Sequence, residues 1–312
     1  PNGYNGTYLK VDHMTMDSSS LIMFDEYVLK AYCHLVYNTE MPKPMMRYLK
    51  AVEKDLEYEA GSAAYKKDEE FWMNEITKSE PMYTDFNGMG RLITQRRENN
   101  NPDQRYAMVV SRNPEAAIAV YHLEKEPSER LMQFCLDVSV KSCVARRGTL
   151  LEKKSGGTRI HFFPVRTYIE PETTFLDALG IIQAEQNKLF RHANFDPIDY
   201  TIRRARHWKN APGTSYESLS LTYQPMTLQR KENEMPDINY KTMWYTNGVA
   251  GQPLYLTVMH RAEDNGLDFN FEYRKDAVTE YEMEYLYYYI CRALFRGIED
   301  PSRTVGEILE MI

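Results

Sequence analysis

The stretch Gly6-Thr7-Tyr8-Leu9-Lys10-Val11 leads directly into Asp12-His13-Met14-Thr15-Met16-Asp17-Ser18-Ser19-Ser20. The first six residues alternate and are rich in β-prone types, which predicts a short strand. The three serines offer N-caps for a helix running to about Leu35, because apolar residues recur there every three or four positions. A histidine therefore follows a strand end, with Asp17 four residues later at the start of a helix.

This arrangement is compatible with chemistry at His13. Strand ends and the loops after them are where layered α/β proteins place functional groups. A histidine can act as a general base because its pKa lies near neutral pH. Asp17 can fix the loop by pairing with a distant arginine or by capping the helix, whose free N–H groups can stabilise developing negative charge. The His-x-x-x-Asp spacing by itself also fits a structural histidine.

Strands and helices alternate along the rest of the chain. The periodicity predicts helices at 68–76, 128–137, 170–190 and 279–295, and strands at 116–123, 159–165, 216–223, 254–260 and 267–273. Residues 78–106 contain prolines, glycines and a polar run, which predicts a linker or mobile loop. The alternation indicates a layered α/β or α+β fold. We expect the tyrosine stripe in 279–295 to pack between helices rather than to form a ligand cage.

Composition and net charge argue against several classes of function. The chain has 38 Lys+Arg and 45 Asp+Glu, a net charge of −7, which disfavours nucleic-acid binding and an anionic membrane surface. The four cysteines, Cys33, Cys135, Cys143 and Cys291, form no C-x-x-C pair and no zinc spacing. We expect reduced thiols, no metal and a cytoplasmic protein. The loop 153–158 lacks the spacing of a phosphate-binding loop and is expected to be solvated.

The string Asp12–Ser20 resembles the His-His-x-x-x-Asp-Gly-x-Ser signature of the condensation domains of nonribosomal peptide synthetases, with the same strand before it and the same helix after it. Further matches follow in the family's order and span nearly all of the chain. They are Phe71-Trp72, Ala145-Arg146 with Arg147 following, Phe163-Pro164-Val165-Arg166, Thr174-Phe175-Leu176 and Leu267–Tyr273.

The resemblance implies an α/β fold of two chloramphenicol-acetyltransferase-like subdomains, each a mixed sheet with helices, arranged as a V-shaped pseudodimer. Residues 1–105 would be the remainder of the N-terminal subdomain, and residues 106–312 the C-terminal one. Donor and acceptor carrier proteins, together with neighbouring synthetase domains, would be the partners. Substrates would arrive as phosphopantetheine thioesters, with no cofactor of the domain's own.

In the family the signature aspartate pairs with an arginine and holds the loop. The resemblance therefore implies that His13 positions or deprotonates the acceptor amine and that Asp17 has a structural role. Arg146 is the first choice of partner for Asp17, and Arg166 the second. The family also implies on the order of 100 residues before the signature, and the order of elements predicts a gap near Ser142-Cys143.

Two positions depart from the signature. Asp12 replaces the first histidine, and its charge would raise the pKa of His13 and make it a poorer base. Ser18 replaces a glycine whose backbone freedom serine lacks. Three alternatives therefore stay open: an acyltransferase that uses a coenzyme A or carrier thioester, an epimerisation relative, and a catalytically silent domain that only docks carriers.

Overall fold

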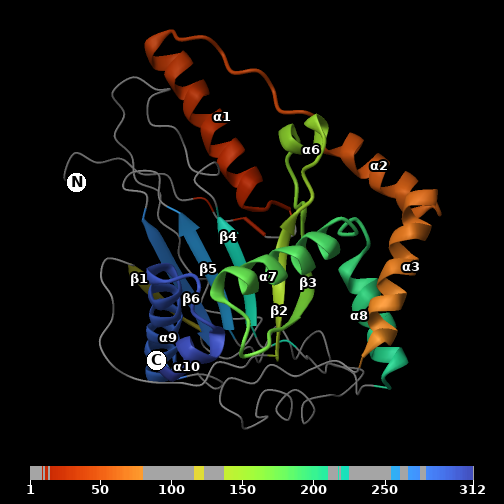
Figure 1. Ribbon diagram of the computed structural model, residues 1–312. Helices are drawn as coiled ribbons and strands as arrows, with labels where there is room; N and C mark the ends of the chain where they lie inside the picture. Colours follow the sequence, from red (N-terminus) through yellow and green to blue (C-terminus); the bar gives the residue numbers. More distant parts are fainter. Residues whose placement is uncertain are drawn as a thin grey trace. The chain divides into compact units, whose positions relative to one another are not determined.

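The structure is a computed structural model of the chain (Figure 1). It describes residues 9, 11–12, 15–79, 116–122, 137–209, 217, 219–224, 254–260, 266–274 and 279–311, without the side chains of 116–122 and 137–139. The described helices are α1 (Ser18–Tyr37), α2 (Tyr48–Glu59), α3 (Ala63–Lys78), α6 (Leu150–Lys154), α7 (Phe175–Phe190), α8 (Pro197–His207), α9 (Glu280–Glu299) and α10 (Val305–Met311). The described strands are β1 (Ala116–His122), β2 (Asp137–Ala145), β3 (Ile160–Tyr168), β4 (Leu219–Gln224), β5 (Leu254–His260) and β6 (Leu267–Arg274).

The chain divides into two compact units. Unit 1 comprises Pro1–Tyr65, Ala145–Ile160 and Thr227–Asn239, and unit 2 comprises Lys66–Val144, His161–Met226 and Tyr240–Ile312. The predicted subdomain boundary between residues 105 and 106 lies outside the described residues and stays a prediction. Most of the expected strand at 6–11, linker at 78–106 and helix at 128–137 also lies outside them.

Helix α1 begins where the sequence predicts, and one of the two kinds of cap that the sequence offered is present. Asp17, rather than one of the three serines, is the N-cap, and its carboxylate accepts a hydrogen bond from the Ser20 N–H at 2.8 Å. A carboxylate at this end also interacts favourably with the helix dipole. The helix ends at Asn38, which has the left-handed backbone (φ 53°) common after a last helical turn.

Unit 2 is built on a mixed sheet. Its strand order is β1-β6-β5-β4-β2-β3. The pairs β2–β4 and β4–β5 are parallel, whereas β5–β6 and β1–β6 are antiparallel. Strand β2 runs unbroken through Ser142 and Cys143, so the strand that the expected gap would remove is present. The predicted α/β class with a mixed sheet is confirmed.

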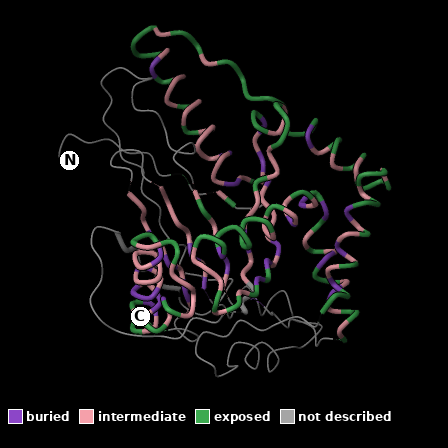
Figure 2. Tube along the Cα trace, in the orientation of Figure 1, coloured by how far each residue is buried: buried purple, intermediate pink, exposed green. Residues whose placement is uncertain are grey.

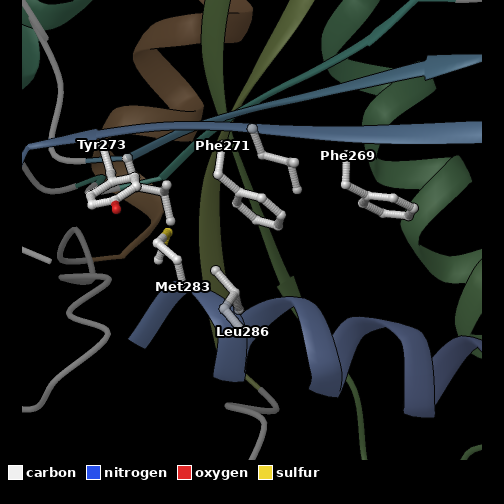
Figure 3. Packing of buried hydrophobic residues seen from close by; sticks show 7 residues of the cluster. Phe269, Phe271, Tyr273, Met283 and Leu286 are labelled. Carbon is white, nitrogen blue, oxygen red and sulfur yellow. The ribbon is translucent and has the colours of Figure 1, made fainter. Parts of the chain in front are cut away.

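The core of unit 2 lies between the sheet and α9. Alternate residues of β5 and β6 point toward the helix, and Figure 3 shows Phe269, Phe271 and Tyr273 above Met283 and Leu286. Phe271 is fully buried and Met283 is 1% exposed. In Figure 2 this region contains many of the buried positions of α9 and the neighbouring strands. Burying such side chains contributes about 1.5–3 kcal/mol each to folding. The burial requires an apolar residue at every second position of a strand and at every third or fourth position of a helix. The spacing of apolar residues in the sequence therefore predicted these elements.

A second packed region joins α3 to β3 and α8. The Trp72 ring of α3 stacks on Phe163 of β3 at 4.3 Å and meets Tyr200 of α8 edge-on at 5.0 Å. Its indole N–H donates to the backbone carbonyl of His192 at 2.9 Å. The aromatic pair at 71–72 therefore anchors this part of the fold.

Part of the tyrosine stripe of α9 packs between helices, as expected, whereas Tyr281 at its start is 54% exposed. Tyr285 and Tyr289 lie in a cluster with Phe175 of α7 and Ile308 of α10. A β-carbon added at Gly297 of α9 would approach the Phe175 ring to 2.4 Å, closer than side chains tolerate. This glycine allows the two helices their close approach.

We predict opposite effects for two helical glycine substitutions. Gly180→Ala, at an exposed position of α7, meets nothing within 4 Å and should raise the free energy of unfolding by about 0.5–1 kcal/mol through helix propensity. Gly297→Ala gains the same propensity but crowds Phe175 and should lower it by about 1–3 kcal/mol. Urea unfolding of both variants measures the difference. Equal stabilisation by both would contradict the packing described for α9.

Candidate functional site

The centre of unit 1 is a buried carboxylate, that of Asp17. Its residue is 1% exposed. The oxygen Oδ1 accepts from the Ser20 N–H, and Oδ2 accepts from the backbone N–H of Arg159, both at 2.8 Å. Just before it, the N–H and the hydroxyl of Thr15 both donate to the Asp12 carbonyl, which ties residues 12 and 15 together. Asp17 thus fixes the start of α1 and joins it to the backbone at Arg159.

The partner of Asp17 is Arg147, so the prediction of Arg146 is wrong by one residue. Nη2 of Arg147 contacts both carboxylate oxygens, at 2.8 and 2.9 Å. The same nitrogen lies 2.8 Å from the Ser20 hydroxyl and 3.1 Å from the Gly157 carbonyl. The side chains of Arg147 and Asp17 are 9% and 1% exposed, so the pair is shielded from water.

Arg147 also holds the short helix α6 in place. Its Nη1 donates to the backbone carbonyls of Glu152 and Ser155 near the C-terminal end of that helix. These carbonyls lack partners within a helix, so a guanidinium there satisfies them and interacts favourably with the helix dipole. One side chain therefore links the helix that follows the signature segment to the loop that follows β2.

Arg146 belongs to a neighbouring pair centred on Asp55 of α2. Its Nη2 lies 2.9 Å from Asp55 Oδ1, and Arg159 contacts both oxygens of Asp55 at 3.0 and 2.7 Å. The Arg159 guanidinium is 1% exposed and lies over the Tyr48 ring, 5.9 Å from its centroid. Since the Arg159 N–H also reaches Asp17, Arg159 joins the two carboxylates into one network.

Gly157 is required by this network. Its φ is +94°, and a β-carbon there would fall 2.0 Å from the Tyr48 ring. Its carbonyl accepts from the Ser20 hydroxyl and from Arg147. The loop 153–158, expected to be solvated, instead has Ser155 and Gly157 buried, because its backbone supplies acceptors to Arg147.

Gly157→Ala is therefore expected to lower the free energy of unfolding by more than about 2 kcal/mol, from backbone strain and from displacement of Tyr48. Gly61→Ala is the matched control, because Gly61 has a similar φ of +96° but nothing within 4 Å. Gly61→Ala should lower the free energy of unfolding by the backbone strain alone, about 1 kcal/mol. Chemical denaturation of both variants is the measurement, and an equal loss in both would contradict the contact with Tyr48.

The other predicted residues are placed as follows. His13 lies outside the described residues. Asp12 is exposed and Ser18 is half-buried. Arg166 is exposed and donates to the Ser79 hydroxyl at 3.1 Å. Asp17 has Arg147 as its partner, so the second-choice pairing of Arg166 with Asp17 is wrong as well. The pairing of Arg147 with Asp17 and the roles of Asp55 and Arg159 were not predicted from the sequence.

The described residues contain no group of three or more His, Cys, Asp or Glu side chains placed to hold a metal ion. None of the helices in the described ranges is long and apolar enough to cross a membrane. Cys33, Cys143 and Cys291 are free thiols, and Cys135 lies outside the described residues.

Comparison with known proteins gives relatives but no matching family model. The chain is 21% identical over 314 residues to a subunit of plipastatin synthase from Bacillus subtilis (strain 168), covering 96% of this chain and 12% of that protein. It is 22% identical over 309 residues to a subunit of surfactin synthase from the same organism, covering 96% of this chain and 8% of that one. It is therefore homologous to a small part of these synthase subunits.

The similarity to solved structures decides the fold. The first condensation domain of the calcium-dependent antibiotic synthetase superposes with a TM-score of 0.66 and 16% identity, over 95% of this chain and 65% of that one. This chain has the condensation-domain fold. The resemblance stated from the sequence is thus confirmed.

Two further solved structures superpose on this chain. One is a doubly substituted mutant of the starter condensation domain of rhizomide synthetase, in complex with C8-CoA and Leu-SNAC (TM-score 0.65, 15% identity, 93% of this chain and 65% of that one). The other is the X-domain from teicoplanin biosynthesis in complex with OxyB (TM-score 0.60, 14% identity, 96% of this chain and 68% of that one).

Proposed function

We propose that this chain is a condensation domain of a nonribosomal peptide synthetase that forms an amide bond between two carrier-bound substrates. The observation that carries the proposal is the buried pairing of Asp17 with Arg147. It holds the aspartate of the signature-like segment at the start of α1, four residues after His13. The condensation-domain fold supports the same conclusion.

The reaction joins a donor thioester to an acceptor amine. The amine nitrogen attacks the carbonyl carbon of the donor thioester and forms the C–N bond. The C–S bond breaks, and the phosphopantetheine thiol of the donor carrier leaves. We assign to His13 the orientation of the amine and the acceptance of its proton, which the leaving thiolate then takes up. An imidazole can do both near neutral pH.

Asp17 and Arg147 are positioning residues in this proposal. Both oxygens of Asp17 are fully engaged by the Ser20 and Arg159 N–H groups and by Arg147, and the carboxylate is buried. A carboxylate saturated in this way has little capacity left for proton transfer, but it fixes the start of α1, four residues after His13 in the sequence.

The partners follow from the reaction. We propose donor and acceptor carrier proteins that present their substrates on phosphopantetheine arms, and neighbouring synthetase domains on the same polypeptide. These arms belong to the carriers, and the domain contributes no cofactor of its own. A cytoplasmic location, expected from the cysteines, belongs to the same proposal.

Two alternative functions are each favoured by what a similar solved structure contains. A protein of the same fold was solved with C8-CoA, which fits an acyltransferase that uses a coenzyme A thioester. Another was solved in complex with a partner protein, OxyB, which fits a domain that docks proteins. If the domain is catalytically silent, we expect the loss of activity to come from Asp12 and Ser18, the two residues that depart from the signature.

The test uses the full-length protein that contains this chain, with an acyl-loaded donor carrier. Aminoacyl-loaded and hydroxyacyl-loaded acceptor carriers are supplied in separate reactions, and acyl-coenzyme A replaces the donor in a third. Mass spectrometry of the acceptor is expected to find amide product from the aminoacyl carrier. Ester product or dependence on coenzyme A would replace the proposal by the acyltransferase. Carrier binding without any product would replace it by the docking domain.

A further inference from the structure

Helix α7 of unit 2 is apolar on every side, yet little of it is buried. Its sixteen residues include three charged ones, and its apolar residues are spread around the whole helix rather than along one stripe. Of these sixteen residues, Ala178 and Leu189 alone are buried. A helix that is apolar all round is normally enclosed by other parts of a protein. Helix α7 therefore has more apolar surface than its own unit covers.

The exposed apolar side chains of α7 lie within two turns of one another. Leu176, Leu179, Ile181 and Ile182 are 64%, 48%, 38% and 39% exposed, and we refer to these four residues as the α7 surface. Single exposed apolar side chains are common on soluble proteins, whereas several close together mark a contact site for another protein surface. The α7 surface is of the second kind.

The charged side chains of α7 do not form a cluster of one sign. Lys188 forms ion pairs with Glu185 at 2.9 Å and with Glu75 of α3 at 3.1 Å. Asp177 lies in the first turn, where it accepts a hydrogen bond from the Thr174 hydroxyl at 2.7 Å and interacts favourably with the helix dipole. Depletion of charge around exposed leucine and isoleucine is typical of the central part of a lasting interface.

The described chain ends close to the start of α7. The Leu176 N–H donates to the Pro301 carbonyl at 3.2 Å, and the Val305 N–H at the start of α10 donates to the Thr173 carbonyl at 2.8 Å. Helix α10 has seven residues and rises 1.5 Å at each, so its last residue lies about 9 Å from its first. Figure 1 marks the chain end beside α10. A polypeptide that continues from this end therefore starts near the α7 surface.

We propose that the α7 surface is where the domain that follows this one in the same polypeptide docks, through an apolar, uncharged patch of its own. The synthase subunits to which this chain is similar are much longer than the part that it matches. A tether as short as α10 gives the next domain a high effective concentration at α7, so that a modest apolar surface suffices for lasting contact. The inference rests on the part of the proposed function that makes this chain one domain of a longer synthetase.

Two other occupants fit the α7 surface less well. A carrier protein has to bind and leave in every reaction cycle, which favours contacts that are steered by charge, and α7 has no cluster of like charges. A second copy of the chain has no tether, so it would need an interface of about 800 Å² on each partner. One helix with four exposed apolar side chains supplies only part of such an area.

The test measures whether the α7 surface is covered in the full-length protein. Leu179→Cys places a thiol on that surface, and Ile202→Cys on α8 is the matched control, because the two native side chains are 48% and 43% exposed. Each variant is reacted with a maleimide, and the rate at each introduced cysteine is followed by peptide mass spectrometry. In parallel samples a photoreactive benzoylphenylalanine replaces the residue at position 179 or 202, and the cross-linked peptides are identified.

We expect Leu179→Cys to react more than about 10-fold more slowly than Ile202→Cys, as for a surface that is covered in more than about 90% of the molecules. Cross-links from position 179 should reach residues that follow this domain in the same polypeptide. Equal labelling rates, or cross-links to a second copy, to a carrier protein or to a preceding domain, would overturn the inference. Neither readout requires amide formation, so these cross-links in a protein that makes no amide would refute the proposed reaction alone.

Discussion

Arg147→Met is expected to lower the free energy of unfolding of unit 1 by about 3–5 kcal/mol, whereas Arg146→Met costs about 1 kcal/mol. Removing Arg147 leaves the Asp17 carboxylate, which is 1% exposed, without its cation, and a buried charge without a partner is strongly destabilising. Removing Arg146 leaves Asp55 paired with Arg159, and Asp55 is 27% exposed, so water and the second arginine limit the cost.

Chemical denaturation of the two methionine variants provides the measurement, and each serves as the control for the other because both remove one guanidinium from adjacent positions. The double variant Asp17→Asn, Arg147→Met should recover part of the loss, since it removes both members of the pair. A larger loss from Arg146→Met than from Arg147→Met would mean that the partner of Asp17 has been assigned to the wrong arginine.

The second large effect is expected at His13. Replacing it by alanine should reduce the rate of amide formation about 100-fold or more, the scale of a lost general base, while the unfolding free energy stays close to that of wild type. The opposite pattern is expected for Arg147→Met, which lowers stability and rate together. His207→Ala is the control, since His207 is exposed on α8 in unit 2 and should affect neither quantity.

Elements with a strong apolar period were predictable from the sequence. The strand at 254–260 coincides with β5, and α9 starts one residue after its predicted beginning. Helix α2 was missed because its apolar residues do not mark a buried face: Leu49 and Leu56 are 70% and 60% exposed, and Ala51 alone is buried. Its place in the structure depends on Asp55, whose partners lie 91 and 104 residues away.

The site was predictable to within one residue. The signature-like segment located Asp17, and the strand end located two adjacent arginines, but successive side chains at a strand end point in different directions. The sequence does not distinguish which of Arg146 and Arg147 faces the aspartate. The role of Gly157 likewise depends on its positive φ and on the ring of Tyr48, and neither leaves a sequence pattern.

The most direct test of the proposed function is the amide product itself. The full-length protein and its His13→Ala variant are mixed with an acyl-loaded donor carrier and an aminoacyl-loaded acceptor carrier, and the acceptor is followed by mass spectrometry over time. We predict an amide-linked acceptor from wild type and a rate about 100-fold or more lower from the variant, with carrier binding intact in both. Product at equal rates from both proteins, or none from either, would contradict the account.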